Sequence, residues 1–362
     1  MAGPDLTLDA RRQQANQAFM ASGAEFAFGD VTALPLPVAE LQALNANSAG
    51  VEAIHDGGLT AEVLCLNHAG RRWAVKRARA ECKVRNPDGQ TSFLNELQRH
   101  AELAPLALPG IVKPVYGSLR AGLVVSPWIA GAHPGVLDER QARALLDTGC
   151  ALIEQGFFEW DYSAGNLLDD GERLWLYDFG YCYRFDPLTQ LNSAGNGRDC
   201  PQFHLAERIE GRHLFGALLD AGSDDEALPH FLAFKRLAIE AYDALVERLV
   251  RRGASPLVLN HYRGLAAHWR DELAHAPSRL YLADAWQAHS SDLDDDLRGR
   301  SCTPRTLRRA EWLQRTLREH GPSLRDSGAL TREDAALSDA TLLACLYERE
   351  LEARHHQLRA QG

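Results

Sequence analysis

The 362-residue sequence lacks any run of apolar residues as long as the roughly 20 that a membrane-spanning helix needs. It has no Cys-x-x-Cys pair, and its seven cysteines are scattered singly along the chain. Because an odd number of isolated cysteines suits neither a disulfide framework nor a structural zinc site, we expect reduced thiols and a cytoplasmic location. The first 20 residues contain no apolar segment typical of a signal peptide, so neither export nor membrane insertion is expected.

Positive charge is also in short supply. The chain has 39 Lys and Arg residues against 49 Asp and Glu, a net charge of −10. A surface of this sign does not attract nucleic acid broadly, so no nucleic-acid partner is expected. Hydrophobic residues make up 45% of the chain and charged residues 24%, as in ordinary globular proteins, which excludes a fully disordered chain.

Apolar periodicity predicts short strands and one main helix in the first third of the chain. The predicted segments are a helix at 8–22, a β-hairpin of Val63–Leu66 and Trp73–Val75, a helix at 91–104 capped by Thr91 or Ser92, strands at 112–115 and 123–125, and a connector at 127–131. A small β-rich lobe with one helix is therefore expected.

The rest of the chain has mainly helical patterns. Residues 138–156 predict a helix capped by Asp138, two short strands follow within 160–178, and helices dominate from about residue 205. Residues 290–301 are polar and charged, which favours a linker. We therefore predict an α+β fold with two lobes, the second larger and mostly helical, followed by extra C-terminal helices.

The expected division is an N-terminal helical extension at 1–45, a small lobe at 46–128, a large lobe at 129–290 and a helical C-terminal extension at 291–362. Two lobes of this kind share one cleft, where a functional site is expected.

The strongest functional signal is Asp161-Tyr-Ser-Ala-Gly-Asn166, followed by a predicted hairpin and then Asp178-Phe-Gly. This pattern resembles the protein-kinase-like superfamily, which includes aminoglycoside, choline and lipopolysaccharide-sugar kinases, and indicates an atypical bacterial-type kinase. The resemblance implies that Asp161 orients the attacking hydroxyl and accepts its proton, while Asn166 and Asp178 hold Mg²⁺ against the phosphates of ATP.

A second motif, Trp73-Ala-Val-Lys76, ends a predicted strand and resembles the Val-Ala-Ile-Lys strand of the same superfamily. The resemblance implies that Lys76 contacts the α- and β-phosphates and pairs with a glutamate of the following helix. Glu96 lies 20 residues after Lys76 and is the favoured partner, and Glu102 is a second candidate.

The nucleotide-binding features are less regular. Gly57 and Gly58, upstream of Val63, stand where a glycine-rich loop should cover the phosphates, although only Gly58 keeps its place in the motif. The pair could equally form a simple turn. Trp128, after the predicted connector strand, could line an adenine pocket or pack between the lobes.

Several residues depart from the protein-kinase pattern. Glu159-Trp160 stands where protein kinases carry His-Arg, and Ser163 stands where many serine/threonine kinases carry lysine. Gly165 precedes Asn166 as in small-molecule kinases, and Ala206-Glu207-Arg208 is only a distant match to Ala-Pro-Glu. The resemblance therefore implies an ATP- and Mg-dependent phosphotransferase whose partners are ATP and a hydroxyl acceptor, a small molecule or glycan being slightly favoured.

Three alternatives remain open from the sequence: a serine/threonine protein kinase, a non-catalytic kinase-like module that binds nucleotide or a partner, and a transferase of AMP. The oligomeric state is not indicated.

Outside the resemblance, three charged segments are expected at the surface. The aspartates of 292–296 are expected to be solvated in the linker, the basic run 305–309 to form an exposed helix face, and His355-His356 to lie at the surface.

Overall fold

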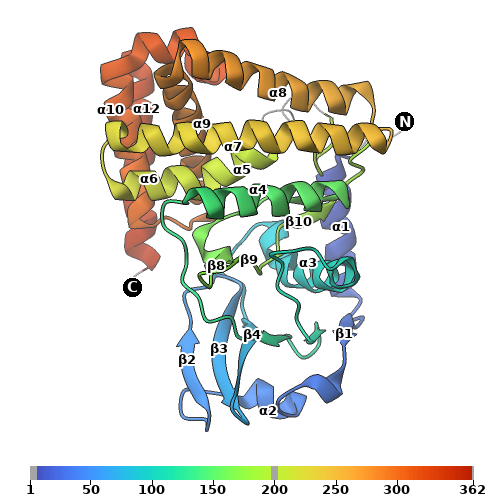
Figure 1. Cartoon of the computed structure of the whole chain (residues 1–362). Helices are drawn as coiled ribbons and strands as arrows, with labels where there is room; N and C mark the ends of the chain where they lie inside the picture. Colours follow the sequence, from blue (N-terminus) through green and yellow to red (C-terminus); the bar gives the residue numbers. More distant parts are fainter. Residues whose placement is uncertain (1–5, 197–202, 361–362) are drawn as a thin grey trace, which may run out of the picture.

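The computed structural model describes residues 6–196 and 203–360 and contains two lobes, shown in Figure 1 with the small β-rich lobe below the helical one. The predicted α+β, two-lobed architecture is confirmed. The first part of the chain forms α1 (Leu8–Ala21), β1 (Ala27–Gly29), a 3₁₀ turn (Val31–Ala33), α2 (Val38–Ala43), β2 (Val51–His55), β3 (Ala61–His68), β4 (Arg71–Ala78), α3 (Pro87–Leu103), a 3₁₀ turn (Ala104–Leu106), β5 (Tyr116–Ser118) and β6 (Leu123–Pro127).

The remaining elements belong to the helical lobe and to the loops that face the small lobe. They are α4 (Glu139–Glu154), β7 (Phe157–Glu159), the 3₁₀ turn η3 (Ala164–Asn166), β8 (Leu167–Asp169), β9 (Leu174–Leu176), β10 (Cys182–Arg184), α5 (Leu205–Ile209), the π-helical turn η5 (Glu210–Leu214), α6 (Phe215–Ala221), α7 (Asp224–Arg251), α8 (Pro256–His275), α9 (Pro277–Gly299), α10 (Pro304–Ser327), α11 (Arg332–Ala335) and α12 (Asp339–Ala360).

The small lobe contains an antiparallel sheet of six strands in the order β1-β5-β6-β4-β3-β2. Strand residues alternate between the two faces of a sheet. On one face Trp73 and Val75 join Leu41 of α2 in a buried apolar cluster. Lys76 therefore points to the opposite face, where it stands between Val63 of β3 and Val124 of β6 in the strand register. The predicted hairpin is confirmed, and its alternation directs Lys76 away from this apolar cluster.

The helix predicted at 91–104 begins earlier, as α3 at Pro87. The cap is Asn86, whose side chain accepts the N–H of Gly89 at 2.8 Å, so the predicted caps Thr91 and Ser92 are wrong. Proline is favoured in the first helical turn, where its missing N–H costs no hydrogen bond. The buried positions in the first turns of α3 are Gly89, Thr91 and Ser92, so the apolar pattern starts later than the helix.

The strand predicted at 112–115 is also wrong: the strand in this region is β5, which begins at Tyr116. Pro114 cannot donate a ladder hydrogen bond, which explains why pairing begins beyond it. Ile111 and Val112 instead pair with Leu176 of β9, and this contact connects the segment after α3 to the large lobe.

The helical lobe is built around α4 and α7, which pack against each other. The Asp138 cap of α4 is confirmed as a capping box with Gln141. The helix pattern expected beyond residue 205 includes α7, on which Phe231 and Leu245 are fully enclosed in the main core. Helices α8, α9, α10 and α12 complete this lobe (Figure 1).

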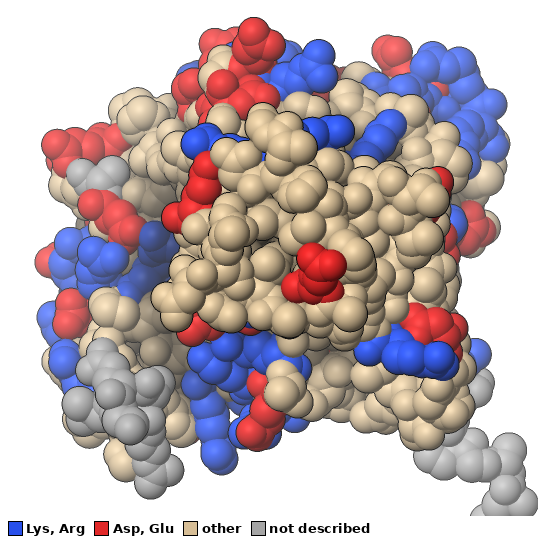
Figure 2. Space-filling model, turned by 90° about the horizontal axis from the view of Figure 1, so that it is seen from below, with Lys and Arg blue, Asp and Glu red and all other residues tan. Residues whose placement is uncertain are grey.

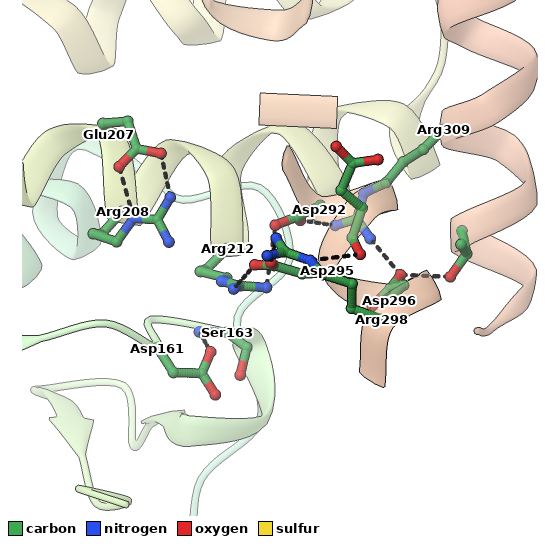
Figure 3. A network of polar contacts seen from close by, with 12 residues as sticks. Asp161, Ser163, Glu207, Arg208, Arg212, Asp292, Asp295, Asp296, Arg298 and Arg309 are labelled. Atoms are coloured by element: carbon green, nitrogen blue, oxygen red, sulfur yellow. Dashed lines mark hydrogen bonds and ion pairs between the residues drawn. The ribbon is translucent and has the colours of Figure 1, made fainter. Parts of the chain in front are cut away.

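The linker predicted at 290–301 is wrong, because α9 continues through it to Gly299. Asp292 is only 3% exposed and pairs with Arg212 and Arg309, whereas the sequence analysis expected it to be solvated (Figure 3). Arg309 is itself 7% exposed, so the expectation of an exposed basic face fails at this residue. Arg305 and Arg308 are partly exposed, as expected. Charges from distant segments neutralise each other here, which permits their burial.

Seen from the small-lobe end, the centre of the surface has few charged side chains, and acidic and basic groups lie around its edge (Figure 2). Within residues 6–196 and 203–360, no helix combines the length and the apolar character that crossing a bilayer requires.

The predicted extension at 1–45 contributes β1 and α2 to the small lobe, and the predicted boundary at residue 290 falls inside α9.

Candidate active site

Three charged residues from three elements meet between the lobes. The ammonium nitrogen of Lys76 on β4 lies 2.8 Å from the carboxylate of Glu96 on α3 and 2.7 Å from Oδ2 of Asp178, which follows β9. The Glu96 side chain is 3% exposed and that of Lys76 is 13% exposed. The structure thus brings together three residues that the sequence analysis had placed on three separate elements.

The electrostatics of this cluster favour the charged forms. Burial by itself lowers the pKa of Lys76, but the carboxylates of Asp178 and Glu96 outweigh that effect and raise the pKa. Burial likewise acts to raise the pKa of Asp178, yet the neighbouring Lys76 ammonium and the N–H of Gly180 hold it below its usual value. Lys76 and Asp178 are therefore an ion pair at neutral pH.

Asn95, the neighbour of Glu96 on α3, fixes the segment that follows Asp178. Its buried side-chain amide donates to the carbonyl oxygens of Phe179, Gly180 and Cys182 at 2.8 to 3.1 Å. The position of α3 is therefore coupled to that of the Asp178-Phe-Gly segment. The sequence analysis missed Asn95, and its only available signal was its place beside Glu96.

Helix α3 is also held from outside by α1, which runs alongside it (Figure 1). Arg12 of α1 pairs with Asp88 in the first turn of α3 at 3.1 Å, and its guanidinium lies 3.5 Å from the ring centroid of Tyr183 on β10. Gln13 donates to the same aspartate at 2.9 Å. Residues of the N-terminal segment thus help to position the helix that carries Glu96.

The loop between β7 and β8 carries Asp161 and Asn166, the latter within the turn η3. The Asn166 amide nitrogen donates to both the backbone oxygen and Oδ2 of Asp161 at 3.0 Å. The other carboxylate oxygen of Asp161 accepts the N–H of Ser163 at 3.1 Å. These contacts fix the rotamer of Asp161, and the five-residue spacing to Asn166 lets the loop close on itself.

Glu159, at the end of β7, is buried directly before this loop. Its Oε1 accepts the N–H of Asp161 at 2.7 Å, and the side chain is among the least exposed polar groups in the protein. Burial raises the pKa of Glu159 well above its usual range, which favours a neutral carboxylic acid here. Glu159 therefore supports the backbone of the loop that carries Asp161.

The loop between β2 and β3 contains Gly57 and Gly58. Arg79 at the end of β4 donates to the carbonyl oxygens of Gly58, at 2.8 Å, and of Asp56, at 2.6 Å. A side chain at Gly58 would collide with the carbonyl of Ala61, which explains the glycine there. The loop precedes the strand that carries Val63, as the glycine-loop motif predicts. The sequence analysis did not find the contact that Arg79 makes with this loop.

Trp128 follows β6 at the junction of the two lobes. Its ring stacks on His55 of β2 with the ring centroids 5.8 Å apart, and its backbone N–H donates to the carbonyl oxygen of Arg72 at 3.1 Å. Val63, in register with Lys76, is half-buried on the same face of the sheet. Val63 and Trp128, which the sequence analysis expects to contact the nucleotide, therefore come from the strands on either side of β4, the strand that carries Lys76.

Glu102 and Glu207, two further residues that the sequence analysis compared with kinase motifs, form ion pairs with arginines. Glu102 pairs with Arg99 at 2.8 Å and with Arg184 at 3.1 Å, so its assignment as the Lys76 partner is wrong. Glu207 binds the adjacent Arg208.

A β-sheet lobe with one principal helix, a larger helical lobe and a lysine–glutamate–aspartate cluster between them define a protein-kinase-like fold. Two crystal structures of the PknI kinase domain of Mycobacterium tuberculosis are similar to this chain at 19% identity. They cover 63% and 64% of this chain and 99% of their own, with TM-scores of 0.34 and 0.31. No model of a protein family and no curated protein matches the chain.

Proposed function

We propose that the protein is an ATP- and Mg-dependent phosphotransferase that moves the γ-phosphoryl group to a hydroxyl acceptor. The observation that supports this most is the convergence of five residues from four parts of the chain. Lys76 contacts both Glu96 and Asp178, Asn166 fixes Asp161, and the backbone N–H of Tyr177, next to Asp178, donates to the carbonyl oxygen of Asn166 at 3.2 Å. A module that only bound a partner would have no need for this arrangement.

Each of these side chains would have a separate role in phosphoryl transfer. The Lys76 ammonium, oriented by Glu96, would bind the α- and β-phosphates. Asp161 would orient the acceptor hydroxyl and take its proton on a carboxylate oxygen as that hydroxyl attacks the γ-phosphorus. Because both Asp161 oxygens already accept hydrogen bonds from Ser163 and Asn166, the carboxylate is held in one orientation for this role.

The oxygen donors needed for Mg²⁺ are available at Asn166 and Asp178. The Asn166 amide nitrogen is used by Asp161, which leaves its oxygen for a metal, and Asp178 supplies a carboxylate. Among the described residues no group of three His, Cys, Asp or Glu could hold a metal ion alone. Mg²⁺ commonly binds one or two protein oxygens together with substrate phosphates, which matches the two donors Asn166 and Asp178. When bound, Mg²⁺ would neutralise charge on the phosphates.

The acceptor is proposed to be a small hydroxylated molecule or a glycan rather than a protein. Ser163 replaces the lysine of many serine/threonine kinases, Gly165 precedes Asn166, and Glu207 is bound by its neighbour Arg208.

The function is tested by incubating the protein with γ-labelled ATP, Mg²⁺ and a panel of sugars, amino alcohols and proteins. The mass of each product is then measured by mass spectrometry. Asp161→Asn is expected to abolish transfer while Mg·ATP binding, measured by calorimetry, stays close to wild type. Asp178→Asn should weaken that binding as well. Asp170→Asn, in the turn after β8, is the matched control and should keep activity. A product heavier by AMP would replace phosphate transfer with adenylylation, and binding without any turnover would indicate a non-catalytic module.

A further inference from the structure

A cavity of about 270 Å³ opens beside the catalytic loop, on the side that faces the helical lobe. Ala164 of the loop forms one wall, Val136 and Ala217 add apolar surface, and Arg212 and Arg305 contribute guanidinium groups. Asp220 is the only acidic residue in the lining. This cavity is separate from the Lys76, Glu96 and Asp178 cluster, which uses none of these side chains.

Arg212, on the turn η5, is held in a fixed orientation toward the loop. Its Nη1 lies 3.2 Å from Asp292, and its Nη2 binds Asp295, both on α9. Figure 3 shows Arg212 next to the loop that carries Asp161 and Ser163, with its guanidinium turned toward Asp292 and Asp295. Burial acts to lower the pKa of Arg212, but Asp292, Asp295 and Asp161 together raise it. The guanidinium is thus a permanent positive charge close to the catalytic carboxylate.

Positive charge is in excess around the cavity because the aspartates are shared. Asp220 pairs with both Arg305 and Arg308, at 2.5 Å each. Asp292 is shared by Arg212 and Arg309. The ion pairs form two separate networks. Arginines 212, 298 and 309 balance aspartates 292, 295 and 296. Arg305 and Arg308 share Asp220 alone, so this second network has one arginine in excess. Arg212 and Arg305, one from each network, line the cavity.

We propose that this cavity binds a phosphate or carboxylate group of the acceptor, so that the substrate is a compact hydroxylated acid. This inference rests on the proposed function and specifies its acceptor. Arginine is well suited to planar or tetrahedral oxyanions because its guanidinium can donate two parallel hydrogen bonds. The volume suits one acidic group with a few carbon atoms and leaves no room for an extended peptide.

The position of the cavity is consistent with that role. Ala164 comes three residues after Asp161, and three residues span at most about 10 Å of chain. A molecule whose acidic group sits against Arg212 and Arg305 can therefore place a hydroxyl at Asp161 when a few bonds separate the two groups. The acidic group would orient the hydroxyl before transfer.

The proposal is tested with matched acceptors that differ only in an acidic group. Formation of ADP is measured with glycerol, glycerol 3-phosphate and glycerate, and with glucose and glucose 6-phosphate. The acidic member of each series is expected to have a kcat/KM at least about tenfold above its neutral partner, the size expected for one charge-assisted hydrogen bond. Phosphate and carboxylate members separate the two anion types.

Arg305 and Arg308 provide matched variants, because both bind Asp220 and both are partly exposed, but only Arg305 lines the cavity. Arg305→Gln should raise KM for the preferred acid about tenfold. Arg308→Gln should leave that KM at the wild-type value. Arg305→Glu should reverse the preference toward the neutral member. Equal effects of Arg305→Gln and Arg308→Gln would overturn the proposal.

A binding experiment keeps this inference separate from the proposed function. Titration of glycerol 3-phosphate into the nucleotide-free full-length protein should release heat in the wild type and in Arg308→Gln, and not in Arg305→Gln. If no acceptor yields ADP but this binding pattern holds, the phosphotransferase function fails while the anion site stands. If ADP forms with no preference for acids, or a serine peptide surpasses every small acid, the function stands and this proposal is wrong.

Discussion

Replacing Glu96 with glutamine should destabilise the wild-type protein but stabilise a variant that already lacks Lys76. In the wild type, Glu96 is 3% exposed and has Lys76 at 2.8 Å as its close cationic partner. The Lys76→Met variant leaves this carboxylate buried with only His100 nearby, at 3.6 Å. Removing one partner of a buried ion pair costs about 3–5 kcal/mol, and the partial exposure of Lys76 favours the lower end.

The second substitution removes the charge that the first one left unneutralised. Lys76→Met with Glu96→Gln is therefore expected to be about 1–2 kcal/mol more stable than Lys76→Met alone. Glu96→Gln alone should lose about 1–2 kcal/mol, because Lys76 keeps Asp178 at 2.7 Å. Glu96→Gln is thus expected to lower the free energy of unfolding of the wild type and to raise that of the Lys76→Met variant.

Urea unfolding followed by tryptophan fluorescence measures the four free energies, and calorimetry with Mg·ATP measures nucleotide affinity on the same samples. Arg143 and Glu240 form an exposed pair at 2.9 Å and provide the control cycle, in which a coupling below about 1 kcal/mol is expected. If the Lys76 and Glu96 changes add to within about 0.5 kcal/mol, the two residues do not act as a pair, and the proposed orientation of Lys76 is refuted.

Three further predictions concern stability. Because burial raises the pKa of Glu159 above its ordinary value of 4.5, its stabilising contribution is complete below that pH and is lost as pH rises. Urea unfolding should therefore show that the free energy of unfolding of Glu159→Gln rises relative to that of the wild type between pH 5 and pH 8. A difference that stays constant over this range would contradict a buried, neutral Glu159. Arg309→Met should cost about 3 kcal/mol by removing a partner of the buried Asp292, and adding Asp292→Asn should recover part of that loss. Arg12→Ala removes the Asp88 pair and the contact with Tyr183, and should cost about 1–2 kcal/mol in the same assay; an unchanged midpoint would show that α1 does not stabilise α3.

Features that depend on neighbours along the chain could be predicted from the sequence. The hairpin that presents Lys76 follows from the alternation of Trp73 and Val75, which needs only a period of two. The cap of α4 at Asp138 is equally local, since its partner Gln141 lies three residues away. The spacing from Asp161 to Asn166 is short enough for one loop to bring both side chains together.

Features that depend on distant partners could not be predicted in this way. The acidic segment around Asp292 has the composition of a solvated linker, and only Arg212, 80 positions earlier, together with Arg309 makes its burial possible. The choice of Glu96 over Glu102 likewise required knowing that Arg99 and Arg184 occupy the second glutamate.

The sequence by itself therefore determined the kinds of elements, the order of the two lobes and the residue types of the candidate site. Only the tertiary structure decided which charges are neutralised, which carboxylates are buried and where a cavity opens beside Ala164. The physical reason is that periodicity and spacing act over a few residues, whereas the energy of a buried charge depends on partners that only folding brings within about 4 Å.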